Sequence, residues 1–206
     1  MPFETFAPLS RIPSITHAFT LRTSGDTKAD DFESRTLTTL GFPSHRFVSA
    51  EQTHGNGVAA VFETTGEQVP MVDALVTAVN NLPLVIRCAD CAAVFIVDRH
   101  TPAIGLAHSG KKGTLANIVG NTLVVMRQRY GTDPGNCLAL IGPSIGPCHY
   151  EMDIWTGIEG QLREAGVRDI HNPRVCTACH PDRYFSYRAE KGRTGRMLAV
   201  LSLKSP

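Results

Sequence analysis

The sequence predicts an α+β or mixed α/β fold. Eight short apolar segments have the composition of β-strands, whereas only three segments have a helical pattern, so a regular βαβ alternation is not expected. Most of the apolar segments show no clean alternation with polar residues, which is typical of strands covered on both faces. At 206 residues the chain has the size of one compact domain, and we expect a single domain over residues 1–206.

The expected strands are short apolar runs bounded by turn-forming residues. They cover residues 57–62, 74–78, 84–88, 93–98, 103–107, 138–141, 184–187 and 197–203. One helix is expected over 114–130, where apolar residues recur along one face and Gly131 follows as a stop signal. A second is expected over 153–165, with Asp153 as its N-cap, and a weaker one over 30–40.

Charge and composition narrow the classes of partner. Twenty Lys and Arg against nineteen Asp and Glu give a net charge of +1, which provides no electrostatic case for nucleic acid or an anionic membrane. No apolar run approaches the ~20 residues that a membrane span needs, and the N-terminus lacks the pattern of a signal peptide. We therefore expect a cytoplasmic protein whose six cysteines are thiols or metal ligands.

Residues 105–112 come within one residue of a P-loop. The segment follows a strand and precedes a helix, but Lys112 stands where a hydroxyl would bind magnesium, and His108 occupies an interior position. A nucleotide-hydrolysing P-loop is therefore disfavoured. Two lysines, Lys111 and Lys112, at a helix N-terminus nevertheless suggest an anion site, beside the simpler interpretation of a solvated basic loop.

Gly142-Pro-Ser144-Ile-Gly146 has the spacing of a nucleophile elbow. The strand-to-helix turn that such an elbow needs is absent, because Pro147 follows at once. A shaped loop is favoured, with a serine hydrolase that uses His171 or His180 as its base as a minor alternative.

Two C-x-x-C units, residues 88–91 and 176–179, could together form a four-cysteine zinc site. Their separation of 84 residues is well beyond the usual spacing of zinc knuckles. The first unit also lies in an apolar stretch in which only Asp90 favours a turn. We therefore expect one of these cysteines to act and the other to be packed. His54 and His108 each lie at the edge of an apolar run near a glycine, and spacing alone does not join them to a cysteine.

Read in order, these segments resemble the laccase-domain family, also called the YfiH-like or polyphenol-oxidase family. The matching stretches run from about residue 19 to the C-terminus. They are Glu51-Gln-Thr-His54-Gly, Val72-Asp73-Ala74-Leu75-Val76-Thr77, Cys88-Ala-Asp90-Cys91-Ala-Ala-Val, Ala107-His108-Ser-Gly110, Ile141-Gly-Pro-Ser-Ile-Gly-Pro-Cys148-His-Tyr150-Glu151, and Phe185-Ser-Tyr187-Arg188 with Thr194-Gly195-Arg196-Met197.

The resemblance implies a YfiH-like layered α/β (α+β) fold with mixed β-sheets and helices on the outside. It also implies a zinc ion bound by His54, Cys91 and His108. Three protein ligands leave a fourth position for water or substrate. It also implies a purine nucleoside phosphorylase that cleaves adenosine, inosine and methylthioadenosine and deaminates adenosine, with nucleoside and phosphate as its small-molecule partners. Copper and the older polyphenol oxidase description are less favoured, because eight scattered histidines without an H-x-H pair do not supply a trinuclear copper cluster.

Several basic residues in the matching stretches are candidates for binding substrate. They are Arg22, Arg35, Lys111, Lys112, Arg188 and Arg196. Lys111-Lys112 replaces the family's usual Trp-Arg, which removes a stacking surface and a bidentate guanidinium. The segment from Phe19 to Arg35 is short, and Cys88 replaces a more usual threonine.

Two other interpretations remain open beside the zinc enzyme. In one, Cys91 is the nucleophile and His108 the base of a metal-independent hydrolase, for example in peptidoglycan-precursor editing. In the other, the chain is a zinc-stabilised binding module without activity. The sequence does not report the oligomeric state.

Overall fold

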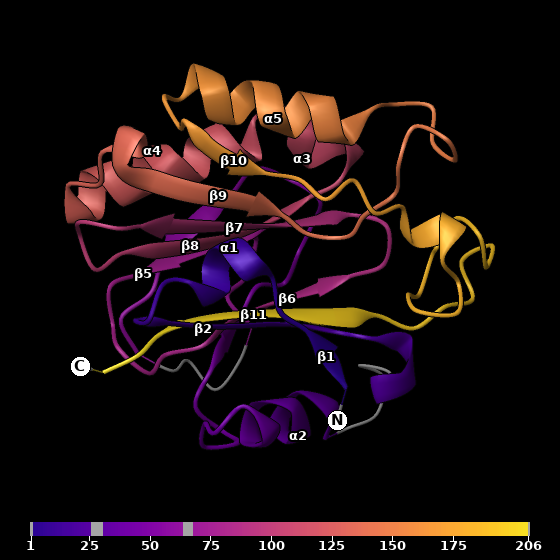
Figure 1. Ribbon diagram of the computed structural model, residues 1–206, viewed down its shortest axis with the longest axis horizontal. Helices are drawn as coiled ribbons and strands as arrows, with labels where there is room; N and C mark the ends of the chain where they lie inside the picture. Colours follow the sequence, from indigo (N-terminus) through magenta and orange to yellow (C-terminus); the bar gives the residue numbers. More distant parts are fainter. Residues whose placement is uncertain (1, 26–30, 64–67, 206) are drawn as a thin grey trace.

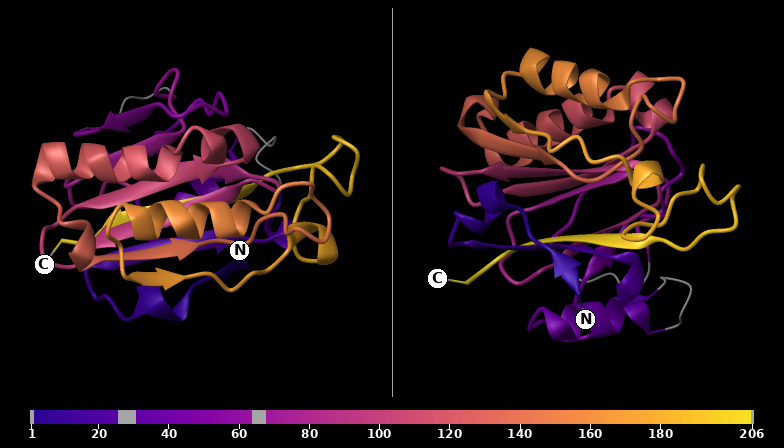
Figure 2. Two further views of the ribbon diagram at one scale, coloured as in Figure 1. Left: turned by 90° about the horizontal axis from the view of Figure 1, so that it is seen from above. Right: turned by 45° about the vertical axis from the view of Figure 1, so that its right-hand side comes forward.

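The computed structural model describes residues 2–25, 31–63 and 68–205, and its elements form four layers (Figure 1). Two β-sheets pack face to face. Helices α3, α4 and α5 cover the outer face of one sheet, and α2 covers the outer face of the other (Figures 1 and 2). This arrangement confirms the predicted layered α/β fold with outer helices.

The first sheet has five strands in the order β1-β2-β11-β6-β3. Their bounds are β1 Phe3–Glu4, β2 Ile15–Thr20, β11 Met197–Leu203, β6 Leu84–Cys88 and β3 Val48–Ser49. Strand β3 runs parallel to β6, and the other neighbours are antiparallel, so the sheet is mixed as expected.

The second sheet has six strands in the order β10-β9-β7-β8-β5-β4. Their bounds are β10 Asp169–His171, β9 Cys137–Ile141, β7 Ala92–Asp98, β8 Ile104–Ser109, β5 Ala74–Thr77 and β4 Val58–Ala60. The connections β3 to β4 and β6 to β7 therefore both cross from the five-stranded to the six-stranded sheet. These two crossings carry the first functional residues.

The helices and turns follow from local signals. Their bounds are α1 Ala7–Ser10, α2 Phe32–Thr39, α3 Lys111–Leu115, α4 Ile118–Tyr130, α5 Ile154–Glu164 and the 3₁₀ turns η1 Arg22–Ser24, η2 Pro134–Asn136 and η3 Thr177–Cys179. Asp153 caps α5 by accepting from the Thr156 amide, as predicted. Of the helix expected over 30–40, residue 30 lies outside the described residues. Within the described part of the chain, none of the helices combines the length and apolar character needed to span a membrane.

The central strands are covered on both faces, as the missing alternation predicts. Along β7, Phe95 faces the core between the two sheets, whereas Val94 and Ile96 face the helices. Along β11, Leu201 faces the same intersheet core, and Val200 packs against α2. Two-sided burial explains why these strands read as continuous apolar runs.

The prediction of a single helix over 114–130 is wrong, because the chain contains two helices there, α3 and α4. Asn117 adopts a left-handed conformation with φ 56°, and its side chain accepts a hydrogen bond from the Gly120 amide to cap α4. Leu115, at the end of α3, is 69% exposed.

The strand expected over 184–187 is also absent. Side chains satisfy its backbone instead, since Met197 Sδ accepts from the Phe185 amide and Glu190 from the Ser186 amide. Conversely, β1, β2, β3 and β10 were not predicted. Three of these are only two or three residues long, and β2 carries His17 and two threonines, which interrupt its apolar pattern.

His17 on β2 makes stability depend on pH. Its ring is 5% exposed and Nε2 accepts from the Phe6 amide at 2.7 Å. Burial and the charge of Lys204 lower its pKa from 6.5 to about 4. Between these values the unfolded chain binds a proton that the folded chain does not, so stability falls as the pH falls.

We expect this histidine to remove about 3 kcal/mol of unfolding free energy between about pH 7 and pH 4. Urea unfolding of the wild type and of His17→Gln, whose amide oxygen can accept from Phe6, measures the effect as the difference in pH dependence. The exposed His45→Gln serves as the control. Equal pH dependence in the wild type and His17→Gln would contradict the assignment.

Candidate metal centre and pocket

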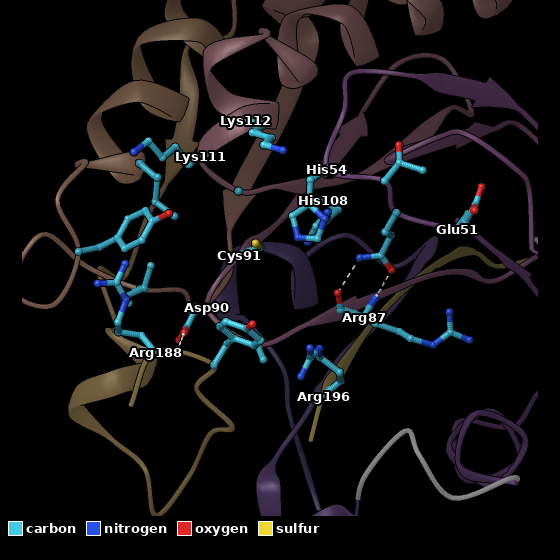
Figure 3. A pocket seen from close by; sticks show the side chains of 18 residues that line it. Glu51, His54, Arg87, Asp90, Cys91, His108, Lys111, Lys112, Arg188 and Arg196 are labelled. Carbon is cyan, nitrogen blue, oxygen red and sulfur yellow. Dashed lines mark hydrogen bonds between the residues drawn. The ribbon is translucent and has the colours of Figure 1, made fainter. Parts of the chain in front are cut away.

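A cavity of ≈ 690 Å³ opens at one end of the two sheets (Figure 3). Its volume lies within the range of small-molecule sites. The lining combines cationic, aromatic and metal-ligating side chains from segments distant in sequence. These residues are Glu51, Gln52, Thr53, His54, Arg87, Ala89, Asp90, Cys91, His108, Gly110, Lys111, Lys112, Ile145, Tyr150, Ile154, Tyr187, Arg188 and Arg196.

The structure brings His54, Cys91 and His108 together in this cavity (Figure 3). One donor atom from each lies within 4.8 Å of the others. His54 lies on the β3–β4 crossing and Cys91 on the β6–β7 crossing, whereas His108 belongs to β8. The antiparallel pairing of β7 with β8 sets Ala92 opposite Ser109, which places Cys91 beside the end of β8. The His54 and His108 rings stand edge to face, with centroids 4.9 Å apart.

A fully buried carboxylate, Asp73, holds two of these three segments in place. Its Oδ1 accepts from the His54 amide at 2.9 Å and lies 2.9 Å from His108 Nδ1. Its Oδ2 accepts from the Gly55 amide at 2.7 Å and from the Thr53 hydroxyl at 3.2 Å. Because His108 donates through Nδ1 to this carboxylate, Nε2 is left to bind a ligand.

Unusual backbone conformations form the rest of the site. His54 has φ 61° and Asp90 has φ 84°, both in the left-handed region that few non-glycine residues adopt. The Asp90 carboxylate accepts from the Thr177 hydroxyl and from the Arg188 amide, both at 2.7 Å, and so stabilises the turn before Cys91. Hydrogen bonds to the carboxylates of Asp73 and Asp90 thus offset the backbone strain at His54 and at Asp90.

The charges of the three donors are coupled. Burial alone would raise the pKa of Cys91, but the charge and hydrogen bonds of His108 and His54 lower it to about 6. Burial alone would lower the pKa of His108, but Cys91 and Asp73 raise it to about 9. The metal-free pair is therefore a thiolate beside an imidazolium at neutral pH. For Asp73, burial is outweighed by hydrogen bonds from His108 and from the Gly55 and His54 amides, so its pKa lies below its ordinary value.

These three residues fit one transition-metal ion. A thiolate and two imidazoles are donors that zinc accepts, and a three-residue set leaves one position open toward the cavity. Of the eight histidines, all within the described residues, only His54 and His108 line the cavity. The donor set therefore suits one ion and lacks the histidines of a multi-copper cluster.

The structure divides the predicted substrate-binding residues into two groups. Lys111, Lys112, Arg188 and Arg196 line the cavity. Arg22 and Arg35 do not, because Arg22 pairs with Glu190 at 2.7 Å and Arg35 pairs with its own helix neighbour Asp31. Helix α3 after Gly110 has only five residues, so the two lysines, rather than a long helix dipole, supply the positive charge there.

The lining residues that the sequence did not predict include Gln52, Arg87, Tyr150 and Tyr187. Arg87 on β6 pairs with Glu33 at 2.6 Å, and the Gln52 side chain exchanges two hydrogen bonds with the Arg87 backbone. Tyr150 and Tyr187 bring two aromatic rings to the cavity, with the guanidinium groups of Arg188 and Arg196 over their faces. Their position depends on loop geometry between β9 and β11, which no local pattern encodes.

The competing motifs are explained by the same structure. Gly105 lies inside β8, so residues 105–112 form no phosphate-cradling loop. Ser144 is fully buried and accepts from Trp155 Nε1 at 2.8 Å, which excludes an exposed nucleophile. Cys88 is 1% exposed in the intersheet core, and Cys91 faces the cavity. The first C-x-x-C unit thus has one packed and one pocket-facing cysteine, as expected.

The fold and pocket define a layered α/β protein with a His₂Cys group at the base of a cationic cavity. The profile of the family described as multi-copper polyphenol oxidoreductase laccase matches residues 20–153 and 149–204. The chain belongs to this family, which confirms the resemblance seen in the sequence.

The relatives carry names of a different kind from the family description. Purine nucleoside phosphorylase YlmD of Geobacillus stearothermophilus is 30% identical, with the alignment covering 86% of this chain and 80% of that protein. Purine nucleoside phosphorylase SCO2081 of Streptomyces coelicolor is 33% identical over 80% of this chain and 78% of that protein. The crystal structure of Geobacillus YlmD superposes with a TM-score of 0.90 at 25% identity, covering 98% of this chain and 99% of that one.

We expect Asp73→Asn to lower metal affinity by about 10- to 100-fold. All four groups around this carboxylate are hydrogen-bond donors, so the NH₂ of asparagine must oppose at least one of them. Competition with a zinc chelator measures the affinity.

Asp98→Asn is the matched control. Asp98 is buried and accepts two backbone bonds through Oδ1, and its Oδ2 has no partner in the described part of the chain. Equal affinity losses in the two variants would show that Asp73 has no special role.

Gly110→Ala should also weaken metal binding, by about tenfold or more, through a steric effect. A Cβ at residue 110 would lie 2.5 Å from Cys91 Sγ, so the sulfur must move. The same chelator competition on Gly160→Ala is the control, because a Cβ there meets no atom within 4 Å. Unchanged affinity in Gly110→Ala would mean that the sulfur position does not matter.

Proposed function

We propose that this chain is a zinc-dependent purine nucleoside phosphorylase that acts on adenosine, inosine and methylthioadenosine and also deaminates adenosine. The observation that carries the proposal is the cavity itself, which combines a three-donor metal group with cationic and aromatic side chains. Family membership and relatives named purine nucleoside phosphorylase support the same assignment. Six free cysteines suit a reducing cytoplasm, where we place the reaction.

Phosphorolysis requires a site for a phosphate dianion beside the ribose. In this reaction a phosphate oxygen forms a bond to C1′ of the ribose, the bond from C1′ to the purine nitrogen breaks, and the base leaves with its bonding electrons. Lys112, Arg188 and Arg196 all line the cavity and offer positive charge to phosphate. Lys111 and Arg188 share Glu151 at 3.0 Å, which fixes two of the cations relative to each other.

The purine base needs a flat apolar surface, which Lys111-Lys112 does not provide in place of Trp-Arg. Tyr150 and Tyr187 are aromatic residues that line the cavity, and Tyr187 is 55% exposed. We infer that these tyrosines take the stacking role. Ile145 and Ile154 add apolar surface beside them.

Zinc, when bound, supplies Lewis acidity and lowers the pKa of water, which is the chemistry that hydrolysis of the amino group at purine C6 needs. The protein residues hold and orient this chemistry. Asp73 fixes the His108 tautomer, and the Cys91 thiolate, with a pKa of about 6 before metal binding, is ready to coordinate at neutral pH. Polyphenol oxidation is not proposed, since the donors suit a single ion.

Activity should require both phosphate and the three donors. We expect inosine to yield hypoxanthine and ribose 1-phosphate only when phosphate is added, as measured by chromatography of the products. His54→Ala and Cys91→Ala should each reduce kcat/KM by more than about 100-fold, because the zinc ion with its free coordination position is lost. His45→Ala, an exposed histidine outside the cavity, should retain full turnover.

The products separate the proposed activities. Free ribose would indicate hydrolysis instead of phosphorolysis, and conversion of adenosine to inosine without phosphate reports the deaminase. Undiminished turnover in Cys91→Ala would refute the metal-centred site. Absence of turnover of every nucleoside, with metal bound, would favour the non-catalytic binding module.

One observation favours a second function. Cys91, His108 and Asp73 form a chain of contacts in which a low-pKa thiol adjoins an imidazole that a carboxylate orients. This is the arrangement of a cysteine hydrolase, and it requires no metal. Such an enzyme keeps its activity after chelation and loses it on alkylation of Cys91, whereas the zinc enzyme loses activity on chelation alone.

A further inference from the structure

A second group of metal-binding side chains lies outside the cavity. Cys148 and His149 belong to the β9–α5 loop. Cys176 precedes η3 and Cys179 ends it, on the segment between β10 and β11. One donor atom from each residue lies within 4.8 Å of all the others. All the cysteines are free thiols, and none of these four residues lines the cavity.

The distances among these donors match a tetrahedral ion. Zinc bonds of about 2.3 Å to sulfur and 2.0–2.1 Å to nitrogen place tetrahedral donors roughly 3.8 Å apart for two sulfurs and roughly 3.6 Å apart for sulfur and nitrogen. Cys148 Sγ lies 3.5 Å from Cys179 Sγ. His149 Nδ1 lies 3.3 Å from Cys148 Sγ, 3.4 Å from Cys179 Sγ and 3.8 Å from Cys176 Sγ.

We propose that Cys148, His149, Cys176 and Cys179 bind a structural zinc ion. Three thiolates and one imidazole complete a four-coordinate shell, so this site, unlike the one in the cavity, has no open position. Neither C-x-x-C unit supplies the whole set. The second unit is completed by the adjacent pair Cys148-His149, which the turns of the β9–α5 loop bring to it.

The backbone around the group is arranged as thiolate ligands require. The Gly146 amide donates to Cys176 Sγ at 3.3 Å, which stabilises negative charge on that sulfur. The η3 turn closes between the two cysteines, with the Cys179 amide donating to the Cys176 carbonyl. Ser144 and Cys176 form a parallel bridge, in which Ser144 exchanges backbone bonds with Val175 and Thr177, so the two ligand segments are already paired.

The ion would fasten the wall of the cavity. Tyr150 follows His149 directly, and Arg188 lies on the chain that continues from Cys179. Arg188 stacks over Tyr150 at 4.8 Å and binds Glu151 at 3.0 Å, so the two ligand segments also meet at the cavity. In Figure 3, Arg188 and Lys111 both lie on the left of the cavity, with Lys111 above Arg188. A zinc ion joining the same segments fixes the positions of these substrate-facing side chains.

Metal content of the full chain tests the proposal. Protein purified under reducing conditions should contain two zinc ions per chain by inductively coupled plasma mass spectrometry. Cys148→Ser and Cys179→Ser should each reduce this to one, and combination with His54→Ala should reduce it to none. Cys137→Ser, which alters a buried cysteine belonging to neither group, should keep both ions.

The zinc content of the variants distinguishes a failure of this second site from a failure of the proposed function. If the cavity binds no ion, the wild type carries one zinc and Cys148→Ser carries none. Cobalt in the His54→Ala variant should show the intense charge-transfer absorption of three thiolates, whereas cobalt in Cys148→Ser should show that of one. Wild-type metal content that Cys148→Ser and Cys179→Ser leave unchanged would overturn the proposal.

Thiol alkylation of the wild type keeps the test valid if a variant fails to fold. Cys148 and Cys179 are exposed, so without a bound ion an alkylating reagent can reach both sulfurs. We expect zinc to protect both until a chelator is added, as mapped by peptide mass spectrometry. Equal alkylation with and without chelator would overturn the proposal. A Cys148–Cys179 disulfide in the purified reduced protein, detected as a mass lower by two hydrogens, would also overturn it.

Discussion

The cavity depends on one buried carboxylate. Asp73 collects hydrogen bonds from the Thr53–Gly55 segment and from the His108 ring, so a single side chain sets the position of two metal donors. A buried carboxylate is stable only when its oxygens are fully paired, and here the groups that pair it belong to the site it supports. Hydrogen bonds within the protein therefore fix the His54 backbone and the orientation of the His108 ring.

Much of the fold could be predicted from the sequence, because strands that are buried on both faces consist of consecutive apolar residues. The strands β5, β6, β7, β8, β9 and β11 were found as uninterrupted apolar runs. What could not be predicted depends on single residues or on distant contacts. Asn117 breaks an otherwise helical pattern through its left-handed backbone, and β2 pairs with β11 across nearly the whole chain despite its mixed composition.

The candidate site was predicted to a similar degree, and for comparable reasons. Family resemblance named His54, Cys91 and His108 as ligands, and the structure brings them together. The supporting role of Asp73 and the pocket positions of Arg87, Tyr150 and Tyr187 depend on tertiary contacts that no spacing reveals. The sequence analysis tested the second C-x-x-C unit only against the first and disfavoured that pairing. It did not consider the β9–α5 loop, where Cys148 and His149, the neighbours of this unit in space, lie.

His54 and Cys91 lie on the two connections that pass from the five-stranded to the six-stranded sheet, whereas His108 belongs to a strand of the six-stranded sheet. The three donors thus come from segments of both sheets, and these sheets are packed together by core side chains such as Phe19, Phe95 and Leu201. Protein interiors are nearly incompressible, so this filling acts as a rigid spacer. The core between the two sheets, far from any substrate, thereby influences how the three metal donors are spaced. Substitutions that change the volume of its side chains offer a way to tune which metal ion fits.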